Sequence, residues 1–353
     1  MSYSLKKINT LIIFFILVLI TLVMRLQDWH NIVPNWDEST YLIMGKYYLT
    51  GGLNGLDYFD NKSSSLFYCY ALLILLFGKN ILGVKIAGVF LISIISLQIY
   101  YLSHKIHDNK IISFLSSVIL IFFFTFELKN GTALYSQYIS LIFFLSGLTF
   151  ILSSKYFYNF LSGLFFCLSL IIRPDIYPVA IILLLTFFFE NKLKNNLVFY
   201  LGGFFAITLE IFPYIITDNF EIYINNLEVL KDSSNYYIYN DTFFIKIINL
   251  IKQHIQLNSS FFLNFHVFIL GFFGFILFLY KCINNRIFYN NYFIAIYLGV
   301  LIYTLILYLN TVPSVEQGMI FLITFNIFFS NYLIIFFSTR KLISYFFIII
   351  FIF

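Results

Sequence analysis

Long apolar runs alternate with short polar segments along most of the chain. Several runs carry no charge and are long enough for an α-helix to cross the roughly 30 Å of hydrocarbon in a bilayer. Because the apolar residues are continuous rather than alternating, the pattern favours helices over strands. We therefore expect an all-α polytopic membrane protein with about 11 transmembrane helices. The expected spans cover residues 9–25, 81–103, 111–127, 133–153, 157–172, 176–189, 196–216, 259–280, 287–309, 317–337 and 342–353.

A shorter apolar run, 66–78, decides the topology. If it crosses the membrane, the basic loop HKIHDNK (104–110) lies outside and every later loop inverts. If it enters and returns, a set of basic residues lies in short cytosolic segments, which the positive-inside rule favours. That set is Lys6, Lys7, Lys105, Lys110, Lys155, Lys192, Lys194, Lys281, Arg286, Arg340 and Lys341. Segment 66–78 is therefore predicted to be a half-embedded helix, with outer loops at 26–65 and 217–258.

The composition supports a membrane protein. Hydrophobic residues make up 61% of the chain and charged residues 10%, too little polar surface for a soluble domain of this size. We expect a single domain over 1–353 with no soluble C-terminal domain. The net charge of +5 is not an indication of nucleic-acid binding, and the cysteine spacing suggests neither a metal site nor disulfides.

Both outer loops are predicted to contain surface helices. In the first, residues Ser39–Leu49 form an amphipathic segment that ends at Gly51-Gly52. Its apolar face is expected to hold Tyr41, Leu42, Tyr48 and Leu49. In the second, the stretch TFFIKIINLIKQHI is typical of a helix lying in the membrane interface. Most acidic residues fall on this outer side, which suggests that the working side is external.

An acidic pair, Asp37-Glu38 in WDESTY, follows the first expected span, and the polar stretch DYFDNKSSS comes shortly after it. Neighbouring carboxylates at a membrane surface are rare in so apolar a chain, so we interpret them as candidate chemistry. The alternative is that Asp37 caps the helix that follows, because acids favour helix starts.

These features, in this order, resemble the GT-C glycosyltransferases. The resemblance rests on W-D-E-x-x-Y after a first span, Gly-Gly after a surface helix, Y-F-D-N-K before an apolar half-helix, and R-P-D at a later helix start. It is nearest to the bacterial polyprenyl-phosphate-dependent enzymes, including the lipid A aminoarabinose transferase type, and to the protein O-mannosyltransferases. It covers most of the chain and implies a GT-C-like bundle.

The resemblance implies roles for four residues. Asp37 stands where such enzymes have a base that takes the acceptor hydroxyl proton, and Glu38 would orient the acceptor or help Asp37 hold a divalent cation, Mg²⁺ or Mn²⁺. Lys62, beside hydroxyls and free amides at Ser63–Ser65, and Arg173 suit the donor phosphate. Relatives have Lys-Pro or His-Pro where this chain has Lys62-Ser63. The alternatives are a snorkelling lysine and an interfacial ion pair.

Further residues are expected to support the site. Asp60 lies near Lys62, and Asp175 is placed to hold Arg173. Relatives commonly have a second acid about where Gln137 stands, so a two-acid metal site would need Glu127 from the preceding helix end. Glu210, inside a span, is either catalytic support or a hydrogen-bonded structural acid.

The sequence thus predicts an inverting membrane glycosyltransferase in a bacterial inner membrane, with its site facing the periplasm or exterior. It would move a sugar from a polyprenyl-phosphate donor to a hydroxyl of a lipid-linked glycan, lipopolysaccharide or protein. The alternatives are a transporter or flippase for lipid-linked sugars, which would show charges deep in several spans, and a surface-polysaccharide polymerase.

Overall fold

The computed structural model describes most of the N-terminal two thirds of the chain and parts of the remainder. The described residues are 2–26, 36–56, 58–107, 109–126, 136–153, 155–191, 193–236, 270–280, 290–310, 324–325 and 327–328. Within these ranges the regular structure is helical and no strand is formed beyond one isolated bridge between Asn54 and Tyr58. The prediction of an all-α protein is confirmed for this part of the chain.

The helices follow the apolar runs closely. They are α1 (Ser2–Met24), α2 (Trp36–Leu49), α3 (Ser64–Phe77), α4 (Ile81–His107), α5 (Lys110–Phe126), α6 (Ser136–Ile151), α7 (Tyr156–Ile172), the 3-10 turn η2 (Pro174–Ile176), α8 (Tyr177–Glu190), α9 (Leu193–Ile216), α10 (Phe220–Tyr236) and α13 (Asn290–Asn310). Residues 270–280 are also helical, within the expected span 259–280. The expected span 342–353 lies outside the described residues.

Two of the described helices are long and apolar enough to cross a membrane, Ile81–Lys105 within α4 and Leu193–Ile216, which is α9. The other apolar helices among the described residues are 10–17 residues long. The larger number of spans expected from the sequence stays a prediction.

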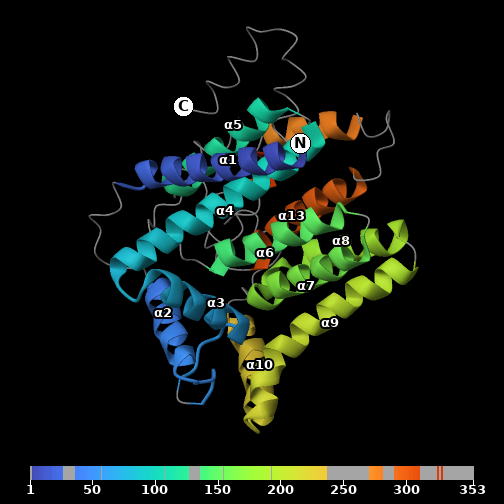
Figure 1. Cartoon of the computed structure of the whole chain (residues 1–353). Helices are drawn as coiled ribbons and strands as arrows, with labels where there is room; N and C mark the ends of the chain where they lie inside the picture. Colours follow the sequence, from blue (N-terminus) through green and yellow to red (C-terminus); the bar gives the residue numbers. More distant parts are fainter. Residues whose placement is uncertain are drawn as a thin grey trace.

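The central helices lie side by side, and α2, α3 and α10 gather at one corner (Figure 1). Two contacts fix the polarity of the bundle. Lys105 Nζ donates to the Leu152 carbonyl at 3.1 Å, so α4 and α6 end together. The ammonium of Lys194 lies 4.8 Å from the centre of the Tyr156 ring, so α7 and α9 begin together. We name this the basic end.

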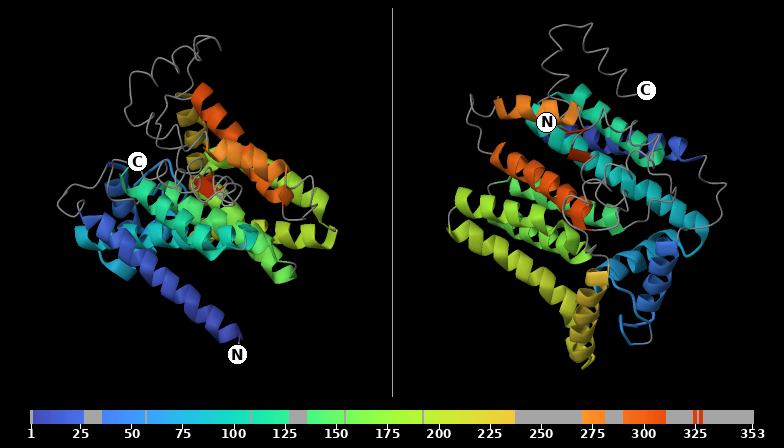
Figure 2. Two further views of the ribbon diagram at one scale, coloured as in Figure 1. Left: turned by 90° about the horizontal axis from the view of Figure 1, so that it is seen from above. Right: turned by 180° about the vertical axis from the view of Figure 1, so that it is seen from behind.

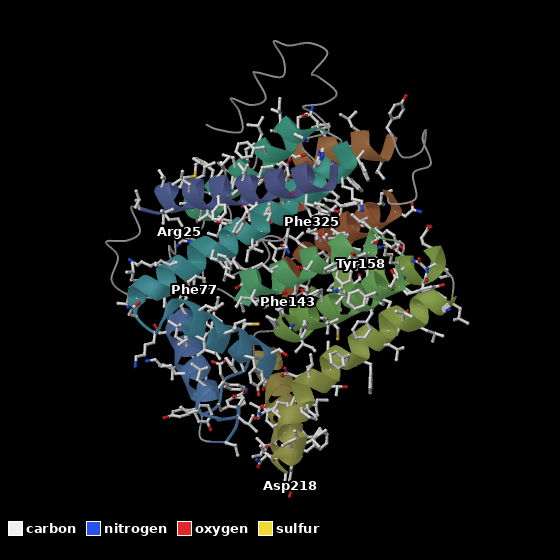
Figure 3. All side chains as sticks on the ribbon, in the orientation of Figure 1. Arg25, Phe77, Phe143, Tyr158, Asp218 and Phe325 are labelled. Atoms are coloured by element: carbon white, nitrogen blue, oxygen red, sulfur yellow. The ribbon has the colours of Figure 1, made fainter. Side chains whose placement is uncertain are left out.

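The opposite end, where α4 and α6 begin and where α7 and α9 finish, is named the site end. Figure 3 shows Arg25 and Phe77, which follow α1 and close α3, on one side of the molecule and Tyr158 toward the other. The view from behind in Figure 2 shows α10 turning away from α9 on the same side as α2 and α3. The corner formed by α2, α3 and α10 therefore belongs to the site end.

Helix α3 begins and ends at the site end. Its first amides contact Glu210 in the last third of α9, and its last residue leads through Gly78 into the start of α4. Gly78 has φ 88°, a left-handed conformation that glycine adopts without steric cost. The chain thus enters and leaves α3 on one side of the bundle, whereas the half-embedded position expected for 66–78 stays a prediction.

Helix α2 corrects two sequence expectations. It begins at Trp36 rather than at Ser39, so Asp37 and Glu38 occupy its first turn and do not precede it. Its buried face holds Tyr41 and Tyr48 as expected, but Met44 completes that face and Leu49 is 40% exposed. This face packs against α3, where Gly45 allows the backbone of Ala71 to approach closely. The predicted end at Gly51-Gly52 is confirmed, with Gly51 at φ 86°.

Helix α10 was not expected. Residues 217–258 were predicted to hold a surface helix only in their later half, which lies outside the described residues, whereas Phe220–Tyr236 is already helical. Its apolar residues Phe220, Tyr223, Ile224 and Leu227 recur at helical spacing, a pattern that the sequence analysis did not use. Its contact with the first outer loop is described below.

Two glycines bring α7 and α9 into backbone contact. A Cβ atom on Gly202 would overlap the Phe160 carbonyl, and one on Gly163 would overlap the Phe199 carbonyl. Small residues at such crossings allow close packing of helices in membranes. The next glycine, Gly203, is different, because a Cβ there would meet its nearest atoms at an ordinary 3.8 Å.

We expect Gly202→Ala to destabilise the protein and Gly203→Ala to leave it unchanged or slightly more stable. Alanine favours a helix over glycine by about 1 kcal/mol, but at position 202 the overlap forces the helices apart, which costs about 1–3 kcal/mol or more. Thermal unfolding of the two variants in the same detergent measures the difference. Equal melting temperatures would contradict the described crossing.

Candidate functional site

The first turn of α2 presents its two acids in different directions. Asp37 is exposed, whereas the Glu38 side chain is fully buried and close enough to Tyr70 in α3 to interact electrostatically with it. Residues one apart on a helix point about 100° apart, while residues four apart share a face. Asp37 therefore shares its face with Tyr41 and not with Glu38.

Arg173 lies where α7 ends. Proline at position 174 has no N–H and cannot continue the helix, so the chain breaks there and restarts through η2. The Arg173 side chain is only 6% exposed, and its Nη1 atom donates to Ser136 Oγ at 3.3 Å. Ser136 is the first residue of α6, and its hydroxyl also lies 3.3 Å from Gln137 Oε1. Arg173 is thereby held at the site end, where α6 begins and α7 ends.

Tyr41 is the point at which these parts meet. Burial raises the pKa of its hydroxyl, and the nearby carboxylates of Asp37 and Asp60 raise it further. The Arg173 guanidinium and a hydrogen bond with Ser136 act in the opposite direction on the same pKa. Charged residues of α2, of the loop before α3 and of the end of α7 therefore lie near enough to act on one hydroxyl, which Ser136 at the start of α6 also binds.

Asp60 contributes a second carboxylate beside Asp37. Burial raises the pKa of Asp60 above its ordinary value, and Asp37 adds to the rise. The Lys62 ammonium and the Lys62 backbone N–H lower it. Among the described residues, no group donates a hydrogen bond to Asp60 Oδ1 although that atom is buried. The site thus holds the carboxylates of Asp37 and Asp60 and the cations of Lys62 and Arg173. Within the described part of the chain, the buried Oδ1 atom of Asp60 could still accept a hydrogen bond.

The raised pKa of Asp60 predicts a pH-dependent effect on stability. The folded protein binds the Asp60 proton more tightly than the unfolded chain, so ionising Asp60 lowers the free energy of unfolding. That cost is present above the folded pKa and disappears as the pH falls through it toward the ordinary value of 3.8.

We therefore expect Asp60→Asn to be more stable than wild type at neutral pH, with the difference shrinking as the pH falls. Thermal unfolding at a series of pH values measures it. Glu228→Gln, which removes one carboxylate at an exposed position of α10, is the matched control for the change in net charge. A variant less stable than wild type at neutral pH would show that ionised Asp60 stabilises the fold.

The start of α3 corrects one part of the predicted phosphate site. The backbone amides of Ser64 and Ser65 were expected to be free for a phosphate, but both donate to the Glu210 carboxylate, at 2.8 and 2.7 Å. The Ser65 hydroxyl donates to the same carboxylate. An internal anion therefore occupies this helix N-terminus. Glu210 is hydrogen-bonded, as expected if it is a structural acid. Lys62 and Arg173 remain the candidates for binding the phosphate of a ligand.

Two predicted supporting groups cannot be placed. Glu127 and the side chain of Asp175 lie outside the described residues, although the Asp175 backbone belongs to η2. Gln137 lies beside Ser136 and is 7% exposed, so it is at the edge of the cluster.

The side chains around Asp37 are poorly suited to bind a divalent cation. Asp37 and Glu38, the predicted pair, project from different sides of α2, although both act electrostatically on Tyr70, and Asp37 also acts on Asp60. No group of three His, Cys, Asp or Glu side chains gathers in the described part of the chain. Mg²⁺ and Mn²⁺ prefer several oxygen ligands, whereas Lys62 and Arg173 already place positive charge beside this pair. The arrangement suits an anionic ligand better than a metal ion.

Sequence reasoning missed the roles of three residues near these charges. Tyr41 was expected on an apolar face and as the last residue of the W-D-E-x-x-Y motif, but not as a group on which the charged residues act. Ser136 and Asn54 gave no signal, because their roles depend on contacts with distant segments. No protein-family model matches the chain, and no curated protein matches it in sequence.

Proposed function

We propose that the protein is an inverting membrane glycosyltransferase of the GT-C type that moves a sugar from a polyprenyl-phosphate donor to a hydroxyl acceptor. The acceptor is a lipid-linked glycan, a lipopolysaccharide or a protein. The observation that carries the proposal is that Asp37, Asp60 and Arg173, from three separate segments, all act electrostatically on the Tyr41 hydroxyl.

The chemistry of such a transfer fits these groups. The acceptor oxygen attacks the anomeric carbon, the bond from that carbon to the phosphate oxygen breaks, and the bonding electrons leave with the phosphate. Asp37, exposed at the start of α2, takes the acceptor proton. Arg173 and Lys62 bind the phosphate and stabilise the negative charge that it gains. A single in-line displacement inverts the configuration at the anomeric carbon.

Charge balance supports the assignment of the phosphate to this position. Arg173 is buried and permanently charged, and a planar guanidinium binds phosphate oxygens in pairs. Asp60 lies near Lys62 and offsets its charge when no donor is present. A lipid monophosphate would bring the negative charge that matches both cations.

The surface of α9 supports a membrane setting. This helix is apolar, and only 28% of its most apolar stretch is buried inside the protein. Exposed side chains along it include Leu197, Leu201, Phe204, Leu209 and Phe212. An apolar surface of this extent is suited to lipid. With the basic end in the cytosol, as the positive-inside rule favours, the site end would face the exterior of a bacterial inner membrane, and the bundle would contain about 11 spans.

The test is reconstitution of the full chain in proteoliposomes with a panel of radiolabelled polyprenyl-phosphate sugars and bacterial envelope fractions as acceptors. The expected result is label in an acceptor and release of unglycosylated polyprenyl phosphate, with inversion at the anomeric carbon. Movement of intact donor across the bilayer without cleavage would instead identify a flippase. If no donor is cleaved, the proposal is wrong.

A further inference from the structure

Asn54 makes an unusually complete set of side-chain hydrogen bonds. It is 3% exposed and lies in the loop between α2 and α3. Its Nδ2 atom donates to the carbonyl oxygens of Asp60 and Lys62, at 2.9 and 3.1 Å, and its Oδ1 atom accepts from the Asp60 backbone N–H at 2.9 Å. Both amide donors are used. The side chain therefore sets the backbone conformation of the two charged residues that it binds.

The Asn54 backbone is held with equal completeness. Its N–H donates to Tyr48 Oη at 2.9 Å. Its carbonyl accepts from Tyr214 Oη at 3.1 Å and from Asn226 Nδ2 at 2.8 Å. These partners come from α2, α9 and α10. Gly55 follows with φ 91°, and a Cβ atom there would overlap Asn226. Asn54 is fixed by three helices.

The far end of the same loop is fixed separately. The Ser64 hydroxyl lies 2.7 Å from Tyr48 Oη and 2.8 Å from Tyr214 Oη, so the two tyrosines that bind Asn54 also hold the start of α3. Glu210 accepts the first α3 amides. The segment carrying Asp60 and Lys62 is therefore anchored on both sides, and Asn54 is the anchor that contacts the segment itself.

We propose that Asn54 is a positioning residue that holds Lys62 and Asp60 in the orientation needed to bind the anionic donor. This inference rests on the proposed function. Asparagine suits the role because it offers two donors and an acceptor on a short side chain. Aspartate keeps the acceptor but loses both donors, and alanine loses all three bonds. Bonds of this kind preorganise a binding site, which lowers the cost of ordering the loop when the ligand binds.

The test compares Asn54→Ala and Asn54→Asp with wild type and with Thr50→Ala. Thr50 lies in the same loop, and its exposed hydroxyl donates to the Tyr47 carbonyl at the end of α2, so its removal spares the 60–62 segment. Two quantities are measured for each protein: amide hydrogen exchange of peptides covering 58–63, and the KM and kcat for a polyprenyl-phosphate sugar.

For Asn54→Ala we expect amide exchange at Asp60 to be about 10-fold faster and the donor KM to rise about 10-fold, with kcat within about threefold of wild type. For Asn54→Asp we expect Asp60 to remain protected while the donor KM still rises, because the acceptor is kept and the donors are lost. Thr50→Ala should match wild type in both measurements.

Unchanged exchange in Asn54→Ala, or faster exchange with an unchanged donor KM, would overturn the positioning role. A lower melting temperature without a change in KM would show a purely structural residue. If the wild-type protein cleaves no donor, the proposed function itself is wrong. This outcome is seen in the wild-type sample before any variant is compared.

Discussion

Replacing Asp37 by asparagine is expected to lower the rate of sugar transfer by about 10²- to 10⁴-fold, the usual contribution of a general base. Asparagine has nearly the same size but cannot take the acceptor proton. Because Asp37 is exposed in the first turn of α2, its loss should leave the fold intact. Initial rates of transfer at saturating donor and acceptor measure the effect, with thermal unfolding as the check on folding.

Glu221→Gln is the matched control for this experiment. Glu221 is also an exposed acid in the first turn of a helix, α10, at the site end of the molecule. Both substitutions remove one negative charge from a helix N-terminus, where acids are favourable, but only Asp37 neighbours Tyr41 electrostatically. Wild-type rates for Asp37→Asn would rule out the assigned role. Equal losses in both variants would point to a general charge effect.

Arg173→Lys and Arg173→Ala are expected to raise the donor KM about 10-fold and about 100-fold, respectively. Hydrogen bonds to charged groups contribute about 1.5–3 kcal/mol each. Lysine keeps the charge but loses the planar fork that matches two phosphate oxygens. It would also have to replace the bond from Arg173 Nη1 to Ser136 Oγ. Initial rates over a range of donor concentrations give both KM values.

The control for the Arg173 variants is Lys155→Ala. Lys155 is exposed and directly precedes α7, so this substitution removes a positive charge at the other end of the same helix. Its donor KM should equal that of wild type, because it lies at the basic end. If Arg173→Ala binds donor as tightly as wild type, the phosphate does not bind beside Arg173 at the end of α7.

The continuous apolar runs predicted α4 to α9 to within a few residues, because burial in a bundle or a bilayer requires little beyond length and composition. The start of α2 was misplaced by three residues, because Asp37 and Glu38 were interpreted as preceding the helix whereas they lie in its first turn. Helix α10 was missed although its apolar residues recur at helical spacing. Its tertiary contacts, such as the one from Asn226 to Asn54, could not be predicted from the sequence.

The candidate site was predictable only in its charged members. Asp37, Lys62 and Arg173 were identified by their residue type and by their position at the ends of apolar runs. Glu210 was noticed as a buried acid, but its partners Ser64 and Ser65 lie 146 and 145 residues away in sequence. Asn54 lies 172 residues from Asn226. A single sequence carries no signal for such pairs, because the partners of Glu210 and of Asn54 have ordinary residue types and lie far away in the sequence.

The bond between Glu210 and the first turn of α3 has a consequence for biosynthesis. The two α3 amides emerge from the ribosome well before the carboxylate that accepts them, since α4 to α8 are made in between. Until α9 is in place, that turn must rely on water or on lipid headgroups. The nascent protein therefore reaches its working shape late in translation, and a chaperone or protease would find the early loop open during that interval.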